Sequence, residues 1–289
     1  MKPLLVHLHI YYPHLYKELK ESVLNITPHK FDLFVTMVEE HSDIISDIKQ
    51  TFPTAKIEIV ENRGYDIGPF IHILNQVNLD DYDYVVKLHT KSDKPTPCYL
   101  FGFDASGDKW RKELTSFMND WFKTISFIEK RQDVGMVAGT NVILDSSDDQ
   151  EIYAQKEALK IAEDILKSHI SEYYLFVAGT MFLARACLFK KIQNKFLLSD
   201  FESANKQGNT LAHIFERIFG IICYMSGYRV VDVGENYLWC RKINFLKYVF
   251  NQIIRFVYQK KVSRSGYLTI KFLKFPIYRK RLSVKDNEI

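Results

Sequence analysis

A short polar cluster near residue 65 carries side chains that could bind a phosphorylated ligand. Its members are Asn62, Arg63, Gly64, Asp66 and Gly68. Arg63 offers a planar fork of donors that suits phosphate, and Asp66 could accept hydrogen bonds from a ribose hydroxyl or a base edge. The two glycines permit close approach of a ligand to the backbone. An ordinary strand-to-helix turn with a surface arginine would contain the same residues, so both interpretations stay open.

A second polar cluster follows the apolar residues 84–88. It contains His89, Thr90, Lys91 and Asp93. Lys91 could neutralise a diphosphate, while His89 and Thr90 could orient a sugar. His89 and Asp93 could also ligate a hard divalent metal such as Mg²⁺ or Mn²⁺. The alternative is a solvated strand end.

A third candidate lies on one face of the helix predicted at 209–226. His213, Glu216, Arg217 and Gly220 recur at i, i+3, i+4 and i+7 and therefore share that face, while leucine and isoleucine cover the other. Three ionisable residues beside a glycine suit acid–base chemistry in a cleft. The alternative is an exposed face whose charges are solvated.

Two further features concern the strands. Residues 173–184 form an apolar run, predicted as a strand interrupted at Gly179. A glycine there would let a ligand touch the backbone, although a β-bulge explains it equally well. His7 and His9 alternate with apolar residues in the first predicted strand, and we interpret them as scaffold histidines rather than ligands.

The first two clusters are placed by a predicted strand–helix–strand unit. The apolar run 57–60 predicts a buried strand, residues 67–74 show helical spacing, and residues 84–88 predict a second strand. Asp66 is suited to cap the helix, and Pro69 is tolerated in its first turn. Such a unit predicts a parallel pair with a right-handed crossover. Because ligands bind outside the carboxyl ends of such strands, both clusters should face one crevice.

The same alternation of strands and helices continues along the chain. Further strands are predicted at 4–10, 31–38, 134–138 and 228–233, and further helices at 13–26, between 42 and 53, at 110–130 and at 150–168. The stretch 91–108 is rich in Pro, Gly, Ser and Asp and is expected to be a functional or mobile loop. This pattern predicts an α/β fold with a doubly wound, mostly parallel, Rossmann-like sheet.

The composition is that of an ordinary globular protein, with 47% hydrophobic and 26% charged residues among 289. Its four cysteines are far apart and form no CxxC pair, which argues against a zinc knuckle or a disulfide scaffold and favours a reducing compartment. Histidines interrupt the first apolar run, so residues 1–14 are not expected to be a signal peptide. No apolar run is long enough to predict a membrane span.

The charge is unevenly distributed. The whole chain carries +4, but residues 237–289 contain thirteen Lys/Arg and two Asp/Glu, so they carry +11 and the first 236 residues carry −7. We therefore predict two domains, 1–236 and 237–289. The second is expected to be a basic, aromatic and helical extension that meets an anionic membrane surface. The alternative is a helix packed on the main domain with a solvated basic tail. Nucleic acid is not an expected partner, because the main body is acidic and no nucleic-acid-binding motif is present.

Four runs occur in an order that resembles the rhamnan synthesis protein F family. They are NRGYDIGPF at 62–70, KLHTKS at 87–92, AGTMFLAR at 178–185 and TLAHIFER at 210–217. The similarity covers roughly residues 4–235 and leaves the basic C-terminal part outside. Members of that family build rhamnose-containing cell-surface polysaccharides, so the resemblance implies a part in polysaccharide synthesis.

The order of parts is also similar to that of GT-A glycosyltransferases. In those enzymes a nucleotide-binding α/β half ends in an acidic DxD motif that holds a divalent metal, and an acidic catalytic motif lies on a later helix. Here residues 89–93 stand where DxD would, and Gly208-Asn209 replaces an acidic residue followed by glycine at the start of the last motif. Glu216 is our first candidate for the base that activates the acceptor. The other candidates are Asp200, Glu202 and His213.

These resemblances imply a cytoplasmic glycosyltransferase, peripheral on the inner face of the plasma membrane. It would move a sugar from a nucleotide-sugar donor to a lipid-linked acceptor of a cell-surface polysaccharide such as O-antigen or capsule. The donor dTDP-rhamnose follows from the resemblance alone. Arg63 and Lys91 would stabilise the leaving diphosphate, backbone near Gly179 would orient the sugar, and the helix bearing Arg217 would close the pocket. The alternative is a non-catalytic carbohydrate-binding or assembly subunit.

Overall fold

The chain forms two compact units. The computed structural model describes residues 2–92, 96–98, 103–105, 107–146, 152–170, 173–203, 210–237, 258–262, 267–272 and 275–281. The first unit comprises Met1–Pro95 with Ser106–Leu238, and the second comprises Thr96–Ala105 with Trp239–Ile289. Every candidate site residue that the structure describes belongs to the first unit.

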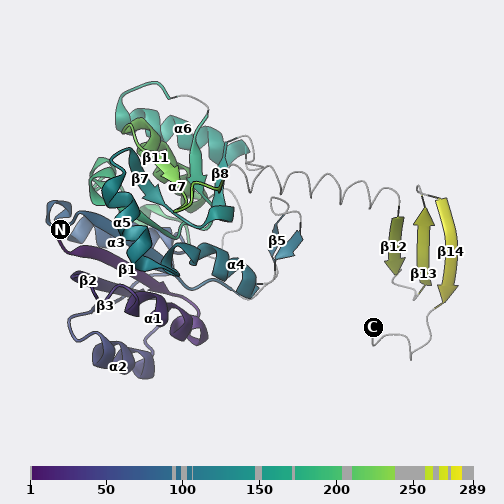
Figure 1. Ribbon diagram of the computed structural model, residues 1–289, viewed down its shortest axis with the longest axis horizontal. Helices are drawn as coiled ribbons and strands as arrows, with labels where there is room; N and C mark the ends of the chain where they lie inside the picture. The colour runs from purple at the N-terminus through teal and green to yellow at the C-terminus, as the bar shows by residue number, and fades with distance from the viewer. Residues whose placement is uncertain are drawn as a thin grey trace. The chain divides into compact units, whose positions relative to one another are not determined.

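A seven-stranded sheet forms the centre of the first unit (Figure 1). The strand order is β11-β7-β10-β4-β1-β2-β3. Its strands are β1 (Leu4–Ile10), β2 (Phe31–Met37), β3 (Lys56–Ile59), β4 (Tyr84–His89), β7 (Val134–Val137), β10 (Phe182–Arg185) and β11 (Arg229–Val231). The first four strands form one parallel block. Strand β10 is antiparallel to both of its neighbours, and β11 is parallel to β7. The predicted α/β class with a mostly parallel sheet is confirmed.

The predicted pairing of the strands at 57–60 and 84–88 is wrong. Strand β3 pairs with β2 and β4 pairs with β1, so two strands separate them. Strand β3 is the edge of the sheet, and Ile59 is 49% exposed rather than buried. Because all four strands are parallel, the carboxyl ends of β3 and β4 still lie along the same side of the sheet.

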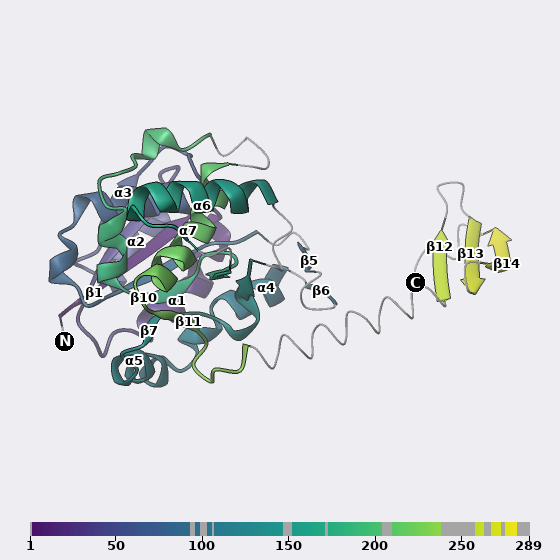
Figure 2. The same ribbon diagram turned by 90° about the horizontal axis from the view of Figure 1, so that it is seen from above.

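The helices pack against the sheet in two groups (Figures 1 and 2). They are α1 (Tyr16–Leu24), α2 (Ser42–Thr51), α3 (Ile67–Gln76), α4 (Gly107–Leu114), α5 (Trp121–Lys130), α6 (Ile152–Leu166) and α7 (Leu211–Met225). Short 3-10 helices are η1 (Pro13–Leu15), η2 (Leu79–Asp81), η4 (Ser116–Met118), η5 (Thr140–Val142), η6 (Ala186–Lys191) and η7 (Leu198–Asp200). Hydrogen bonds join α1 to α2 and to α4. Helix α7 contacts both α3 and α6, and α6 runs alongside it in Figure 2.

Several predicted elements differ from the observed ones. The helix predicted at 110–130 is divided, because η4 separates α4 from α5 and Asp120 caps α5 by accepting from the N–H of Lys123 at 3.1 Å. The run 173–184 does break at Gly179, and its halves join different sheets. Strand β9 (Leu175–Val177) pairs with β8 (Ile143–Asp145), whereas β10 joins the main sheet. Asn209, the predicted cap of α7, lies outside the described residues.

Aromatic side chains fill the core between the sheet and the α3–α7 pair. Phe70, Phe182, Phe189 and Phe219 have ring centroids 5.3–6.2 Å apart, a spacing that favours aromatic pairs. Helix α7 is buried on almost every side. At Gly220 a Cβ atom would lie only 2.0 Å from a carbonyl oxygen of β9. The glycine therefore permits close helix–strand contact.

The described part of the second unit consists of strands. Strands β12 (Tyr258–Val262), β13 (Tyr267–Phe272) and β14 (Phe275–Arg281) form an antiparallel sheet, and β5 (Thr96–Cys98) pairs with β6 (Phe103–Ala105). The helical part of the predicted extension, at 243–258, lies outside the described residues except for Tyr258, so it stays a prediction. The described residues that follow it, 258–262, 267–272 and 275–281, form strands. Within the described ranges, no helix has the length and apolar character needed to cross a bilayer.

Candidate functional site

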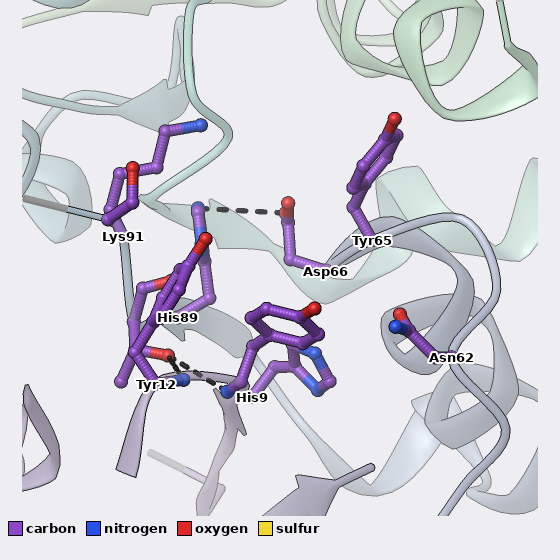
Figure 3. A pocket seen from close by; sticks show the side chains of 10 residues that line it. His9, Tyr12, Asn62, Tyr65, Asp66, His89 and Lys91 are labelled. Carbon is purple, nitrogen blue, oxygen red and sulfur yellow. Dashed lines mark hydrogen bonds and ion pairs between the residues drawn. The ribbon is translucent and has the colours of Figure 1, made fainter. Parts of the chain in front are cut away.

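A hollow of about 280 Å³ lies at the carboxyl ends of β1 and β4, beside the loop that joins β3 to α3 (Figure 3). It is lined by His9, Tyr11, Tyr12, Asn62, Tyr65, Asp66, His89, Thr90, Lys91 and Ser92. The strand order reverses at β1, since β2 lies on one side of it and β4 on the other. Doubly wound sheets bind ligands at this switch point, so position alone favours a binding site.

A buried ion pair lies next to the hollow. The Lys87 ammonium, with no exposed surface, donates to Asp66 Oδ2, to Thr180 Oγ1 at 2.9 Å and to the Thr180 carbonyl at 3.1 Å. Thr180 Oγ1 donates to the same carboxylate oxygen at 2.6 Å. Burial alone would raise the pKa of Asp66, but electrostatic interaction with His89 and Lys87 and these hydrogen bonds hold it well below its usual range. Asp66 is therefore ionised.

The turn at Gly179 and Thr180 is held from two sides. Their φ angles are +78° and +50°, and the second is strained for a threonine. Glu216 Oε1 accepts from the Gly179 N–H at 2.6 Å, and His89 Nε2 donates to the Gly179 carbonyl at 2.7 Å. The other oxygen of Glu216 accepts from Arg217 at 2.7 Å. These α7 side chains fix the turn, and neither lines the hollow.

Thr90 fastens the end of β4 to the segment that follows β1. Its Oγ1 accepts from the N–H groups of Tyr11 and Tyr12, both at 2.9 Å, as the dashed lines in Figure 3 show. Since both lone pairs are used, the Thr90 hydroxyl hydrogen is left to donate. The two tyrosine rings meet edge to face at 4.8 Å and form an aromatic wall of the hollow.

Three buried histidines of β1 and β4, namely His7, His9 and His89, are neutral at physiological pH. Burial lowers the pKa of His9 to about 3 and that of His89 to about 4, and it also lowers the pKa of His7 well below its usual value. Thr36 Oγ1 lies 2.9 Å from His7 Nε2 and 2.9 Å from His9 Nδ1. These rings are hydrogen-bonding groups rather than charges.

Five predicted donor-binding residues line the hollow together, namely Asn62, Asp66, His89, Thr90 and Lys91. Asp66 stands at the N-cap position of α3, but its side chain makes no capping bond because it points to Lys87. Gly64 and Gly68 shape the loop instead. Gly64 has a φ of +65°, and a Cβ at Gly68 would lie 2.2 Å from the carbonyl oxygen of Arg63. Asp93 lies outside the described residues.

Other predicted site residues stabilise the surroundings of the hollow. Arg63 donates to Glu61 at 2.7 Å and to the Phe201 carbonyl at 3.1 Å. Asp200 accepts a backbone N–H at the start of η7 at 2.8 Å, and Glu202 accepts one at the start of α7 at 2.9 Å. None of these three candidates is a lining residue.

His213 is not a lining residue, but it contacts one. Its ring centroid is 5.8 Å from that of Tyr65, which lines the hollow, and its Nδ1 is 2.7 Å from Thr210 Oγ1. The predicted sharing of one helix face by His213, Glu216 and Arg217 does not make that face solvent-exposed, because Arg217 is only 4% exposed.

The described residues do not fit a divalent metal at His89. Both ring nitrogens face carbonyl oxygens, with Nε2 2.7 Å from that of Gly179 and Nδ1 3.3 Å from that of Thr90. The nearby carboxylate of Asp66 is already paired with Lys87. Within the described ranges no group of three His, Cys, Asp or Glu side chains could hold a metal ion.

Sequence reasoning missed Lys87 and Thr180, and it interpreted His9 as scaffold. A lysine inside the apolar run 84–88 was a usable signal, because a charge in a central strand needs a buried partner. His9 does bond to Thr36, but it also lines the hollow, and its Nε2 has no hydrogen-bond partner.

Replacing Asp66 by Asn should destabilise the protein by about 3–5 kcal/mol, because Lys87 would stay buried without a counter-ion. The double variant Asp66→Asn/Lys87→Met should recover more than half of that loss, since it removes both charges. Urea unfolding at pH 7 measures both changes. A loss below about 1 kcal/mol for Asp66→Asn would show that the ion pair does not matter for folding.

Stability should fall as the pH drops from about 6.5 to 5. In this window the unfolded chain protonates histidines that the folded protein keeps neutral, so the unfolded state binds more protons. Each buried histidine contributes up to about 1.4 kcal/mol per pH unit. Urea unfolding across this range gives the slope of the unfolding free energy against pH, which measures how many more protons the unfolded state binds. His7→Gln should reduce that number by about one. The change Gln50→Ala, at an exposed residue that does not titrate, should leave it unaltered, and an equal effect of both would contradict the explanation.

Comparison with known proteins finds one matching family model and two curated relatives. The model of the family described as rhamnan synthesis protein F matches residues 1–228. Two curated relatives, each described as uncharacterized protein WxcX and found in two strains of Xanthomonas campestris pv. campestris, are 27% identical over 235 residues. The alignment covers 79% of this chain and 32% of theirs, so the chain spans about a third of the length of the curated relatives it matches. Because the family model covers most of the sequence, the chain belongs to the rhamnan synthesis protein F family.

Proposed function

We propose that this protein binds a nucleotide-activated sugar at the hollow and transfers the sugar to a growing polysaccharide. Its family implies a role in rhamnan or related polysaccharide synthesis. The observation that carries the proposal is that the ionised carboxylate of Asp66 and the ammonium of Lys91 both line the hollow at the switch point of the sheet. A carboxylate that accepts from hydroxyls, next to a cation that attracts phosphate, suits a sugar diphosphate.

Lys91 is the proposed diphosphate contact. It lines the hollow, is partly exposed and makes no ion pair with the described residues, whereas the guanidinium of Arg63 is engaged by Glu61 and Phe201. Charge builds on the diphosphate as its bond to the sugar breaks, so a cation placed beforehand lowers the barrier. The side-chain hydrogen bonds of Asp66 within the described ranges go to Oδ2, so Oδ1 is the proposed acceptor for a donor hydroxyl.

The acceptor base is proposed to be His213. Both carboxylate oxygens of Glu216 are already bonded, one to the Gly179 N–H and one to Arg217, which favours a positioning role for Glu216. His213 keeps Nε2 without a bond to the described residues and contacts Tyr65. In the proposed step the acceptor oxygen bonds to the anomeric carbon, the bond to the diphosphate breaks, and the hydroxyl proton passes to His213. The GT-A-like assignment and dTDP-rhamnose as donor belong to the same proposal. Binding without turnover would instead favour a carbohydrate-binding subunit.

The basic C-terminal part is proposed to hold the enzyme at the anionic inner face of the plasma membrane. Residues 237–289 carry +11, and charges near an anionic surface contribute about 1 kcal/mol each. Such a position would bring the hollow to a lipid-linked acceptor.

A panel of nucleotide sugars should include one, with dTDP-rhamnose first, that protects the protein against thermal unfolding equally in EDTA and in Mg²⁺. Replacing Lys91 by Met should weaken that ligand about tenfold, because a hydrogen-bonded charge contact is lost. The matched change at Lys49, exposed on α2, should have no effect. Thermal-shift titration measures all three. Protection by no member of the panel would rule out donor binding.

Flotation with liposomes tests the membrane proposal on the full chain. Replacing Lys260, Lys261, Lys271 and Arg279 together by Gln should reduce binding to anionic vesicles at least tenfold, because about 1 kcal/mol is lost per charge. The control replaces four exposed lysines of the first unit, namely Lys17, Lys49, Lys123 and Lys130. Equal binding by the two variants would contradict the proposal.

A further inference from the structure

His9, the penultimate residue of β1, has a ring nitrogen without a hydrogen-bond partner in the described chain. The residue is 2% exposed and lines the hollow, and its Nε2 is buried without a hydrogen-bond partner. An unsatisfied buried polar group costs about 1–3 kcal/mol. Because this atom lies at the wall of a cavity, a bound ligand could supply the missing hydrogen bond.

His7 provides an internal comparison. It occupies the same face of β1 two residues earlier, is equally buried, and bonds to the same Thr36 hydroxyl. Its Nδ1 also lacks a partner. However, its ring packs 5.6 Å from that of Phe70 in the core and does not line the hollow. Only one of two otherwise similar histidines can therefore reach a ligand.

The hydrogen bonding of Thr36 indicates which chemical group His9 can meet. One hydroxyl hydrogen lies between two ring nitrogens, so Thr36 cannot donate to both rings. His9 Nε2 is then an N–H or a lone pair, depending on which ring donates. A ligand hydroxyl both donates and accepts, so it satisfies either form, whereas a phosphate oxygen satisfies only the N–H form. Burial also keeps the ring neutral, so His9 has no charge to attract phosphate.

The other unsatisfied groups of the hollow can also bond to ligand hydroxyls. Asn62 Oδ1 is buried without a partner, Asp66 Oδ1 makes no hydrogen bond within the described ranges, and the Thr90 hydroxyl hydrogen is free to donate. A volume of about 280 Å³ is just below the range of roughly 300–1,000 Å³ that is typical of small-molecule pockets. The hollow therefore suits one hydroxylated ring of a nucleotide sugar, and the rest of such a ligand would extend beyond it.

We propose that His9 Nε2 hydrogen-bonds to a ring hydroxyl of the bound ligand and that His9 is a specificity-determining residue of this site. This inference rests on the proposed nucleotide-sugar function. The ring is either the transferred sugar or the pentose of the nucleotide, because both present hydroxyls.

Two substitutions separate the free nitrogen from the one that bonds to Thr36. His9→Asn keeps an amide near the position of Nδ1 and removes Nε2, whereas His9→Gln keeps a polar group near Nε2. His7→Gln is the matched control, because it preserves the Nε2-like bond to Thr36 and removes only the nitrogen in the core.

Isothermal titration of the full chain with dTDP-rhamnose, dTDP and rhamnose 1-phosphate tests the inference. We expect His9→Asn to reduce the affinity for dTDP-rhamnose about 5- to 10-fold and His9→Gln to reduce it less. His7→Gln should leave the affinity unchanged. Weakening of dTDP as well assigns the ring to the pentose, and weakening of rhamnose 1-phosphate assigns it to the sugar. Wild-type affinity in His9→Asn, or an equal loss in His7→Gln, would overturn the inference.

The same titration separates this inference from the function on which it rests. A wild-type chain that binds none of the three probes removes the proposed function and the inference together. Where His9→Asn does not fold, the ¹⁵N resonances of histidine-labelled wild-type protein replace it, with His9→Gln supplying the assignment. The His9 Nε2 resonance should move on addition of dTDP-rhamnose while that of His7 Nδ1 stays, and an unmoved His9 resonance overturns the inference.

Discussion

The ammonium of Lys87, placed at the centre of a sheet with no exposed surface, has to be neutralised and hydrogen-bonded within the protein. Its partners are Asp66 and both oxygens of Thr180. Asp66 precedes α3 and Thr180 precedes β10, so a single buried charge draws the β3–α3 loop and the turn before β10 to the end of β4. The loop that lines the hollow is therefore located by a core interaction and not by its own sequence alone.

This requirement also explains two local departures from ideal backbone and capping geometry. Asp66 gives up the capping bond to α3 that its position would allow, a sacrifice of about 1 kcal/mol that the ion pair offsets. The positive φ of Thr180 persists because Lys87 and Asp66 hold its side chain, while Glu216 and His89 hold the preceding glycine. Helix α7 thus supports the hollow indirectly, because Glu216 fixes the turn at Gly179.

The sequence predicted much of the framework because alternating apolar runs and helical spacings are local properties. The strand at 4–10 and the break at Gly179 were found in this way. The neighbours of β3 and β4 in the sheet were not predicted correctly. A crossover fixes the relative direction of two strands but leaves open how many strands lie between them. Helical spacing likewise placed Glu216 and Arg217 on one face of α7 but could not reveal that α6 and β9 cover this helix. His9 matched a scaffold histidine because only three dimensions show that one of its nitrogens bonds to Thr36 and the other does not.

The charges around the hollow suggest how an anionic ligand could be accommodated there. Asp66 is matched by Lys87, and burial keeps His9 and His89 neutral, so Lys91 is left as the net positive charge among the lining residues. Because Lys87 already neutralises the carboxylate of Asp66, that carboxylate would repel a diphosphate beside Lys91 less strongly. An internal ammonium therefore performs part of the neutralisation that a divalent ion provides in other phosphate sites. It does so permanently, because it is built into the strand, and this leaves the free oxygen of Asp66 available for hydroxyl groups.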